Sequence, residues 1–127
     1  MQELVKEFLS QGRFAVIGSF RNESKYAYRI MLALMSKGYK VYPVNPRLKQ
    51  VEGITCYASL KNIPGSVDVV DIVTPPEITE KIVKECFQQH ITRVWLQPGA
   101  ESKQAIEFCH KNDIKVIHGL CIMMESI

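Results

Sequence analysis

A short polar stretch in AVIGSFRNESKYAYRI, residues 15–30, carries the residue types that bind phosphate groups. An apolar run ends at Gly18, a polar loop follows, and an amphipathic segment begins near Ser24 and Lys25. The start of a helix attracts anions through its free N–H groups and its positive dipole end. Arg21 and Lys25 add full positive charges at the same turn. We therefore predict a phosphate site here, although either cation alone is more simply a solvated surface charge.

The spacing of the glycines excludes familiar nucleotide-binding motifs. No Gly-Lys-Ser/Thr sequence stands where a Walker A loop needs it, and Phe20 and Glu23 replace glycines of the GxGxxG fingerprint. The next apolar run, residues 39–46, ends without the acidic residue that binds the ribose of NAD, and Arg47 and Lys49 follow it. A pyrophosphate ligand with an additional ribose phosphate would use this basic pair. NADP and coenzyme A both fit that description.

The elements that position these residues alternate between buried strands and amphipathic helices. Continuous runs rich in Val and Ile are typical of parallel strands that are buried on both faces. The runs are FAVIGS (14–19), YKVYPVNP (39–46), VDVVDIVTPP (67–76), TRVWLQPG (92–99) and IKVIHG (114–119). With helices between them and right-handed crossovers, they predict an α/β fold: a single doubly wound, mostly parallel, Rossmann-like sheet with helices on both faces. We expect residues 1–127 to form one domain.

Apolar residues at helical spacing predict a helix before the first strand and three helices between the strands. The apolar positions are Leu4, Val5, Phe8 and Leu9 in a leading helix within residues 1–12; Ala27, Ile30, Met31, Leu34 and Met35; Ile78, Ile82, Val83, Cys86 and Phe87; and Ala105, Phe108 and Cys109. Gly38 stands where the helix after the first strand should end, and TPPE (74–77) indicates a capping box with proline in the first turn. In residues 47–66 we expect a loop, a short edge strand near residues 54–57 and one helical turn before Pro64.

Polar and turn-forming residues follow four of the predicted strands at their carboxyl ends. They are Gly18 and Ser19; Asn45 and Pro46; Thr74, Pro75 and Pro76; and Gln97, Pro98 and Gly99. Each group alone is compatible with an ordinary loop. In a doubly wound sheet, however, these ends meet at one rim, where ligands bind. The four groups together therefore favour a ligand cleft.

The chain resembles the small stand-alone CoA-binding proteins, whose Rossmann-like domain is similar to the N-terminal, CoA-binding domain of the succinyl-CoA synthetase alpha subunit. The resemblance covers residues 14–125 and rests on the blocks VIGSFRNESKYAYRIM, GYKVYPVNP, ITCYASLKNIPGSVDVVDI, TPPE, WLQPGAE and CIMMES. PVNP and WLQPGAE are the most distinctive of these blocks. The resemblance implies that the chain binds coenzyme A or a short acyl-CoA without catalysis of its own.

The resemblance also implies a place for each site residue. The CoA phosphates would be surrounded by Gly18, Ser19, Arg21 and Lys25. The adenosine part would lie beside Asn45, Pro46 and Arg47, with Arg47 or Lys49 near the ribose phosphate. The middle of the cleft would be lined by Thr74, Pro75 and Pro76, and the pantetheine arm would pass Gln97, Pro98 and Gly99. The chain departs from the family pattern at Ala27, where a serine is expected, and at Gly119, where a polar residue is commoner.

Other functions stay open at this point. An NADP-dependent reductase would use the same cleft, and a CoA-site subunit could serve a larger acyl-CoA synthetase-type assembly. The three histidines have no acid at motif spacing, so we predict no catalytic residue. Cys121 could meet the CoA thiol if its pKa were lowered, but we favour a structural role for it. The four cysteines form no CxxC pair, so we predict no metal site.

The composition excludes several classes of partner. The 127 residues are 46% hydrophobic and 23% charged, and the formal net charge is only +3. The basic residues are scattered rather than clustered with aromatic residues, which counts against nucleic acid. No apolar run is long enough to span a membrane, and the N-terminal residues do not resemble a signal peptide. We therefore expect a cytoplasmic protein with reduced thiols and a small-molecule ligand, and its size and uncovered sheet edge are compatible with a homodimer.

Overall fold

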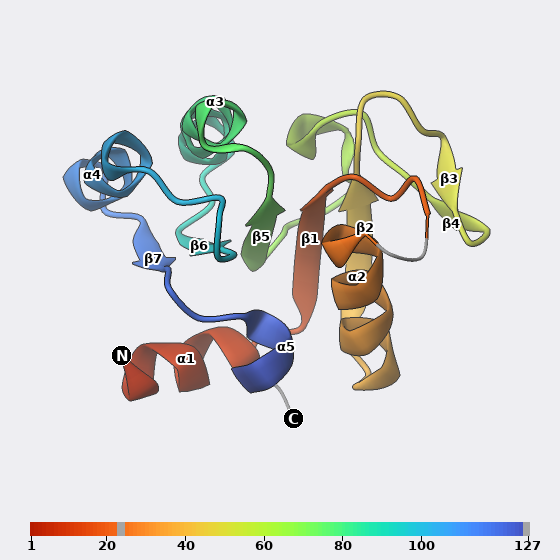
Figure 1. The fold of residues 1–127 in the computed structure, drawn as a ribbon, viewed down its shortest axis with the longest axis horizontal. Coiled ribbons are helices and arrows are strands. Elements are labelled where there is room, and N and C mark those ends of the chain that lie inside the picture. The colour runs from red at the N-terminus through yellow and green to blue at the C-terminus, as the bar shows by residue number, and fades with distance from the viewer. Residues whose placement is uncertain (23–24, 126–127) are drawn as a thin grey trace.

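The computed structural model describes residues 1–22 and 25–125, and its centre is a five-stranded parallel sheet (Figure 1). In chain order the strands are β1 (Arg13–Gly18), β2 (Lys40–Val44), β5 (Val69–Val73), β6 (Arg93–Leu96) and β7 (Lys115–Ile117). Across the sheet they lie in the order β2-β1-β5-β6-β7, and every neighbouring pair is parallel. The chain moves from β1 to β2 and then returns to β5 on the other side of β1, which creates a switch point between β1 and β5. This topology confirms the predicted doubly wound α/β fold.

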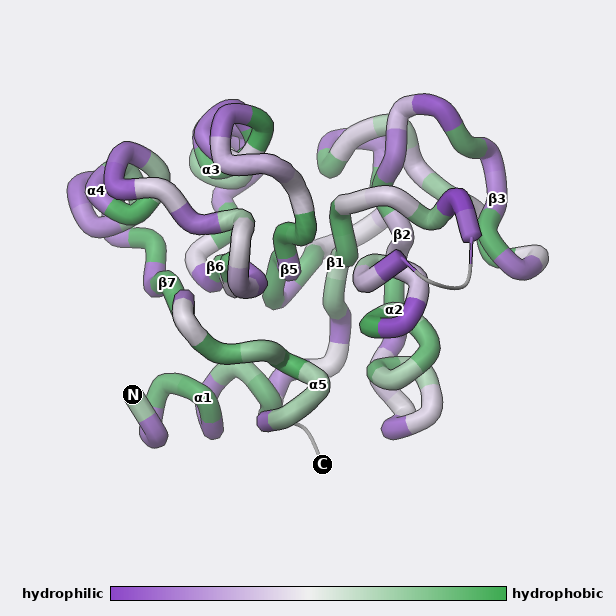
Figure 2. Tube along the Cα trace, in the orientation of Figure 1, coloured by the Kyte–Doolittle hydropathy of each residue, from purple (hydrophilic) through white to green (hydrophobic). Residues whose placement is uncertain are grey.

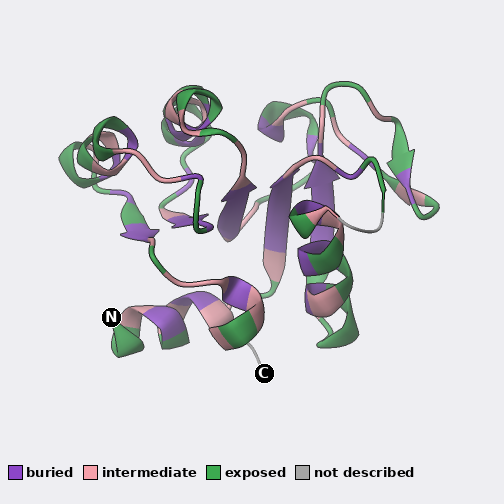
Figure 3. Ribbon diagram, viewed as in Figure 1, coloured by how far each residue is buried: buried purple, intermediate pink, exposed green. Residues whose placement is uncertain are grey.

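Helices cover both faces of the sheet, as predicted. On one face are α3 (Pro76–Gln88) and α4 (Lys103–Lys111); on the other are α1 (Gln2–Leu9), α2 (Tyr26–Ser36) and the short α5 (Ile122–Glu125) (Figure 1). Along β1, Ala15 and Ile17 join the core beneath α3 and α4, while Phe14 and Val16 join the core on the opposite face. Figure 2 shows hydrophobic residues along the strands, and Figure 3 shows β1 and β5 buried over most of their length. Burial on both faces explains the continuous apolar runs of the sequence.

The predicted helical stripes are confirmed in their centres and differ at their ends. The residues buried as predicted are Ala27, Ile30, Met31 and Leu34 in α2; Ile82, Val83 and Cys86 in α3; and Ala105 and Cys109 in α4. In α3, however, Ile78 is 40% exposed and Phe87 is 49% exposed. Ile78 lines a cavity instead of the core, and Phe87 packs its ring edge-on against Phe108 of α4. The apolar stripe of α3 therefore also serves a cavity and a helix–helix contact.

The start of α3 corrects a prediction. The capping box at residues 74–77 is wrong, because Pro75 is the N-cap and α3 begins at Pro76 without a side-chain cap. The Thr74 hydroxyl lies one residue too early and is hydrogen bonded to the Thr79 hydroxyl at 2.8 Å. Proline has a backbone φ that suits the first helical position. The prolines therefore start this helix without a capping-box hydrogen bond.

The segment between β2 and β5 contains the expected short strand, but that strand belongs to a small hairpin instead of the central sheet. β3 (Gln50–Val51) pairs antiparallel with β4 (Ile54–Thr55), and these strands form a sheet of their own. Tyr57 makes an isolated parallel bridge to Val44 of the central sheet. The expected helical turn before Pro64 is confirmed as the 3₁₀ helix η1 (Leu60–Asn62).

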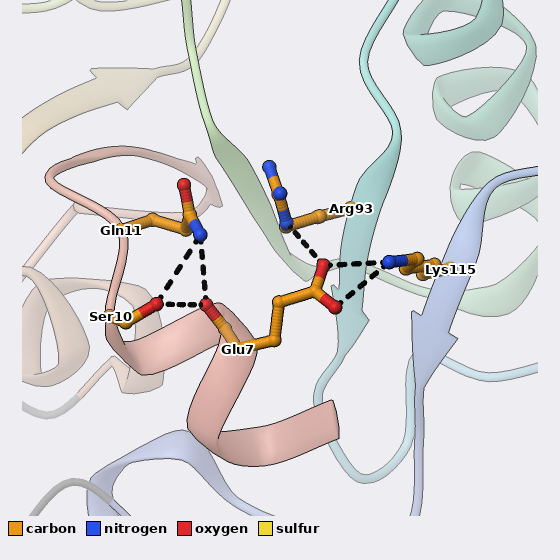
Figure 4. Close-up of polar contacts among 5 residues, drawn as sticks. All are labelled: Glu7, Ser10, Gln11, Arg93 and Lys115. Atoms are coloured by element: carbon orange, nitrogen blue, oxygen red, sulfur yellow. Dashed lines mark hydrogen bonds and ion pairs between the residues drawn. The ribbon is translucent and has the colours of Figure 1, made fainter. Parts of the chain in front are cut away.

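The leading helix packs against the sheet, as predicted, and it is fastened at the amino ends of the strands. Phe8 is fully buried, with its ring 6.0 Å from that of Trp95. The Glu7 carboxylate accepts hydrogen bonds from Arg93 Nε at 2.7 Å and from Lys115 Nζ at 2.8 Å (Figure 4). These bonds, the one from Lys115 above all, lower the pKa of Glu7. Arg93 and Lys115 begin the paired strands β6 and β7, so α1 is tied to the edge opposite the predicted ligand rim.

Candidate ligand cleft

Residues that follow β1 and β2 line a cavity of about 410 Å³ at the carboxyl ends of these strands. The lining residues are Ser19, Phe20, Arg21, Asn45, Arg47 and Leu48. Arg21 and Arg47 are exposed and come from two different loops. Within the part of the chain that the structure describes, neither guanidinium has an ion-pair partner. The two loops therefore present unneutralised positive charge to one cavity, as a site for phosphate requires.

Asn45 joins the two loops. Its side-chain Nδ2 donates a hydrogen bond to the Gly18 carbonyl oxygen at 2.7 Å. Its Oδ1 accepts one from the backbone N–H of Arg47 at 2.8 Å, and its carbonyl oxygen accepts one from Leu48 N–H. A single amide thus fixes the end of β1 against the chain that carries Arg47.

Gly18 allows a very close approach of β1, β5 and α2. A Cβ atom at this position would lie 2.7 Å from the Val73 carbonyl oxygen and 2.8 Å from Ala27 Cβ. These separations are far below contact distance, so a larger residue at position 18 does not fit without movement. The departure from the family pattern at Ala27 has a packing role here, since this side chain is buried against Gly18.

The start of α2 lies next to this cavity. Lys25 is the N-cap of α2, and its backbone N–H donates to the Asn22 carbonyl oxygen at 3.2 Å. The cap has no side-chain hydrogen bond, and the Lys25 side chain is not among the residues that line the cavity. Glu23 and Ser24, which the sequence analysis also considered, lie outside the described residues.

A second cavity, of about 390 Å³, adjoins the first through Ser19 and Asn45, which line both. Most of its wall is apolar, with contributions from β1, β2, β5 and α3: Ile17, Gly18, Val44, Pro46, Ala58, Val73, Pro75, Ile78 and Ile82. Its polar members include Ser59, Thr74 and Glu85. The Glu85 carboxylate accepts a hydrogen bond from the backbone N–H of Leu60 at 3.1 Å, which holds the loop before η1 against α3.

A third cavity, of about 240 Å³, continues along the rim to β6. Its lining residues are Val73, Thr74, Pro75, Pro98, Gly99 and Ala100, and the first three also line the second cavity. Gly99 has a φ of 96°, a backbone conformation that favours glycine. Its N–H donates to Glu101 Oε1 at 2.7 Å. The three cavities therefore form one row above β2, β1, β5 and β6 that crosses the switch point.

Comparison with known proteins identifies the family of the chain that carries these cavities. Residues 12–127 match the family model described as the CoA binding domain. The chain belongs to this family. Its fold and the position of its cavities agree with the resemblance that the sequence blocks indicated.

The relatives of this CoA-binding domain differ in length. The chain is 31% identical over 126 residues to the alpha subunit of an ADP-forming acetate–CoA ligase II from Pyrococcus furiosus, and it spans only 28% of that protein. It is 28% identical over 119 residues to the uncharacterized protein YneT of Bacillus subtilis, of which it spans 88%. A solved structure of a conserved hypothetical protein from Pyrococcus furiosus matches with a TM-score of 0.87 at 37% identity, over 91% of this chain and 99% of that one.

The rim of this CoA-binding domain brings together most of the residues that the sequence indicated. Those that line the cavities are Gly18, Ser19, Arg21, Asn45, Pro46, Arg47, Thr74, Pro75, Pro98 and Gly99. Pro76 does not line a cavity but begins α3. Lys49 is exposed, and its backbone carbonyl accepts a hydrogen bond from Cys56 N–H.

Gln97 lies in a different place from the one expected. Its side chain is only 3% exposed and is not among the residues that line the cavities. Its Nε2 donates to Asp71 Oδ1 at 2.6 Å, and its Oε1 accepts from the backbone N–H of Ile122 at 3.2 Å. Both ends of the amide are therefore engaged within the core. Gln97 connects β5, β6 and α5, while Pro98 and Gly99 continue to the cavity.

The sequence analysis did not single out Asp71, an ionisable residue in the core. It is fully buried on the central strand β5, and its Oδ2 has no hydrogen-bond partner among the described residues. Burial raises the pKa of this carboxyl to about 7, although the hydrogen bond from Gln97 opposes the shift. The available signal was that Asp71, the second of two acids in VDVVDIV, stands between the apolar residues Val70 and Ile72.

Two buried thiols offer little chemistry in this CoA-binding domain. Burial raises the pKa of Cys109 to about 11 and that of Cys86 well above its usual value, so both thiols are inert. Cys121 is half-buried next to α5.

The described residues include no group of three or more His, Cys, Asp or Glu side chains placed to hold a metal ion. No helix in residues 1–22 or 25–125 has the length and apolar character to cross a membrane.

Proposed function

We propose that this chain binds coenzyme A, or a short acyl-CoA, along the row of cavities and carries out no chemistry of its own. The observation that carries the proposal is the pair of unneutralised guanidinium groups, Arg21 and Arg47, on a cavity that adjoins an apolar one. Coenzyme A has the same division, because its phosphates are strongly anionic and its adenine and pantetheine arm are much less polar. Membership of the CoA binding domain family supports this ligand.

The proposal assigns the parts of the ligand to the cavities. Arg21 and Arg47 would bind the diphosphate and the ribose phosphate, with the positive end of α2 and Lys25 adding to the field. Lys49 would assist from the exposed chain after Arg47. The base would occupy the largely apolar second cavity, and the pantetheine arm would leave over Pro98 and Gly99.

A second candidate function uses the same site within a larger assembly. The acetate–CoA ligase relative is a subunit of which this chain spans 28%, which favours a CoA-site subunit that works with further domains. The relatives of similar length, of which this chain spans 88% and 99%, favour a protein that acts alone. An NADP-dependent reductase has less support, since no acid–base pair lines the described cavities.

Isothermal titration calorimetry with coenzyme A, dephospho-CoA and NADPH tests the proposal. Wild-type protein is expected to bind coenzyme A most tightly. Arg47→Ala should weaken coenzyme A about tenfold, because a hydrogen bond to a charged group contributes about 1.5 kcal/mol or more. It should also remove most of the preference over dephospho-CoA.

Arg29→Ala is the matched control, because Arg29 is an exposed arginine of α2 that lines none of the described cavities. Equal affinity for coenzyme A and dephospho-CoA in the wild type would contradict the role given to Arg47, and tighter binding of NADPH would favour the reductase. Native mass spectrometry of the purified protein weighs any retained ligand and tests the predicted homodimer. The cytoplasmic location stays a prediction.

A further inference from the structure

The two arginines of the first cavity are carried by separate parts of the chain. Arg21 lies on the loop that leads into α2, and Arg47 lies on the connection that leads into the β3–β4 hairpin. The hairpin stands beside the central sheet near α2, and β3 and β4 pair only with each other (Figure 1). Asn45 fixes the backbone N–H of Arg47 relative to β1, and the chain beyond Arg47 is held by the way in which the hairpin is fastened to α2.

The hairpin is fastened both at its base and at its tip. At its base, Val51 is buried in the core that also contains the inner face of α2. At its tip, the Tyr28 hydroxyl of α2 donates a hydrogen bond to Glu52 Oε1 at 2.5 Å. The second contact joins the two chain segments that follow the arginines, because Tyr28 follows Arg21 on the α2 side and Glu52 follows Arg47 on the hairpin side.

Glu52 is an unfavourable residue for the turn that it occupies. The turn between β3 and β4 has Glu52 at a φ of 50° and Gly53 at a φ of 76°. A two-residue hairpin turn with two positive φ values prefers glycine, asparagine or aspartate at its first position. Glutamate offers the turn nothing, whereas its longer side chain reaches Tyr28. The geometry points to a role for Glu52 outside the turn itself.

We infer that Tyr28 and Glu52 are positioning residues that hold Arg47 at the correct distance from Arg21 for phosphate binding. This inference rests on the proposed function. When the hydrogen bond is absent, the hairpin is fastened only at its base. Arg47 then samples a wider range of positions, and ordering it again on binding reduces the affinity.

Calorimetric titration of coenzyme A into four variants tests this inference. Tyr28→Phe removes the donor and should weaken binding about fivefold, as the loss of one exposed hydrogen bond allows. Glu52→Gly suits the turn but removes the acceptor, so binding should weaken by a similar factor while the melting temperature stays within about 3 °C of the wild type. Glu52→Gln keeps an acceptor oxygen and should bind nearly as the wild type does. The double variant Tyr28→Phe with Glu52→Gly should lose no more than either single variant.

The variants separate positioning from charge and from stability. Glu52→Gly and Glu52→Gln both remove a negative charge, so a difference between them cannot come from charge alone. Tyr26→Phe is the control for the tyrosine, since Tyr26 is 57% exposed at the start of the same helix. If the wild type binds coenzyme A while Tyr28→Phe and Glu52→Gly bind it equally well, the inference fails and the proposed function stands. A wild type that does not bind overturns both.

Discussion

The buried carboxyl of Asp71 makes the stability of this protein dependent on pH in an unusual direction. An exposed aspartate has a pKa near 3.8, and burial raises that of Asp71 to about 7. The folded protein therefore holds a proton that the unfolded chain releases between these two values. Protonation stabilises the fold fully below pH 3.8, and this stabilisation is lost as the pH rises through about 7.

The size of the effect follows from the two pKa values. One pKa unit corresponds to about 1.4 kcal/mol, so the complete loss amounts to about 4 kcal/mol. Between pH 5 and pH 8 the contribution of this residue should fall by about 3 kcal/mol. The side-chain amide introduced by Asp71→Asn would resemble the protonated acid, because its oxygen can still accept the hydrogen bond from Gln97 and it carries no charge.

Urea unfolding at several pH values measures this contribution. The free energy of unfolding of Asp71→Asn, measured relative to that of the wild type, should increase by about 3 kcal/mol between pH 5 and pH 8. Asp113→Asn is the control, because Asp113 is exposed and has a φ of 58° that asparagine tolerates. Parallel pH curves for the wild type and Asp71→Asn would refute the reasoning.

Three further predictions concern the stability of the fold. Gly18→Ala should destabilise the protein by about 2 kcal/mol in urea unfolding, because the added Cβ has no space. Gly12→Ala is the control and should not destabilise it, since a Cβ at position 12 would have no neighbouring atom within 4 Å. Glu7→Gln should lower the melting temperature at pH 7, and the difference should disappear as acid protonates Glu7, since its lowered pKa stabilises the fold only above that pKa. Ser102→Ala removes the cap that accepts from Ala105 N–H at 3.0 Å in α4 and should cost about 1 kcal/mol in chemical unfolding.

The sequence was most informative where one physical rule dominates. Strands buried on both faces must be continuously apolar, and parallel neighbours must be joined by right-handed crossovers, so the sheet and its ligand rim could be predicted. Most rim residues were found because polar and turn-forming residues follow four strands whose carboxyl ends meet at one rim, although each group alone is compatible with an ordinary loop. The family blocks then added the ligand class, which the charges near Gly18 and Arg47 could not distinguish from NADP.

The errors arose where tertiary contacts decide. Gln97 follows β6 directly, and nothing in its neighbours indicates that its amide turns into the core toward Asp71. Asp71 lies in a run whose members face two different cores, so its surroundings depend on strands far away in sequence. The hairpin formed because Glu52 and Gly53 adopt positive φ values, and glutamate is a poor signal for such a turn.

The hydrogen bonds of Asn45 place few demands on the side chains of its partners. Four of its hydrogen bonds involve main-chain atoms, those of Gly18, Arg47, Leu48 and Tyr57. Since every residue supplies a carbonyl oxygen and nearly every residue an N–H, the bonds to positions 47, 48 and 57 do not depend on the side chains there, whereas Gly18 is restricted by the lack of space for a Cβ atom.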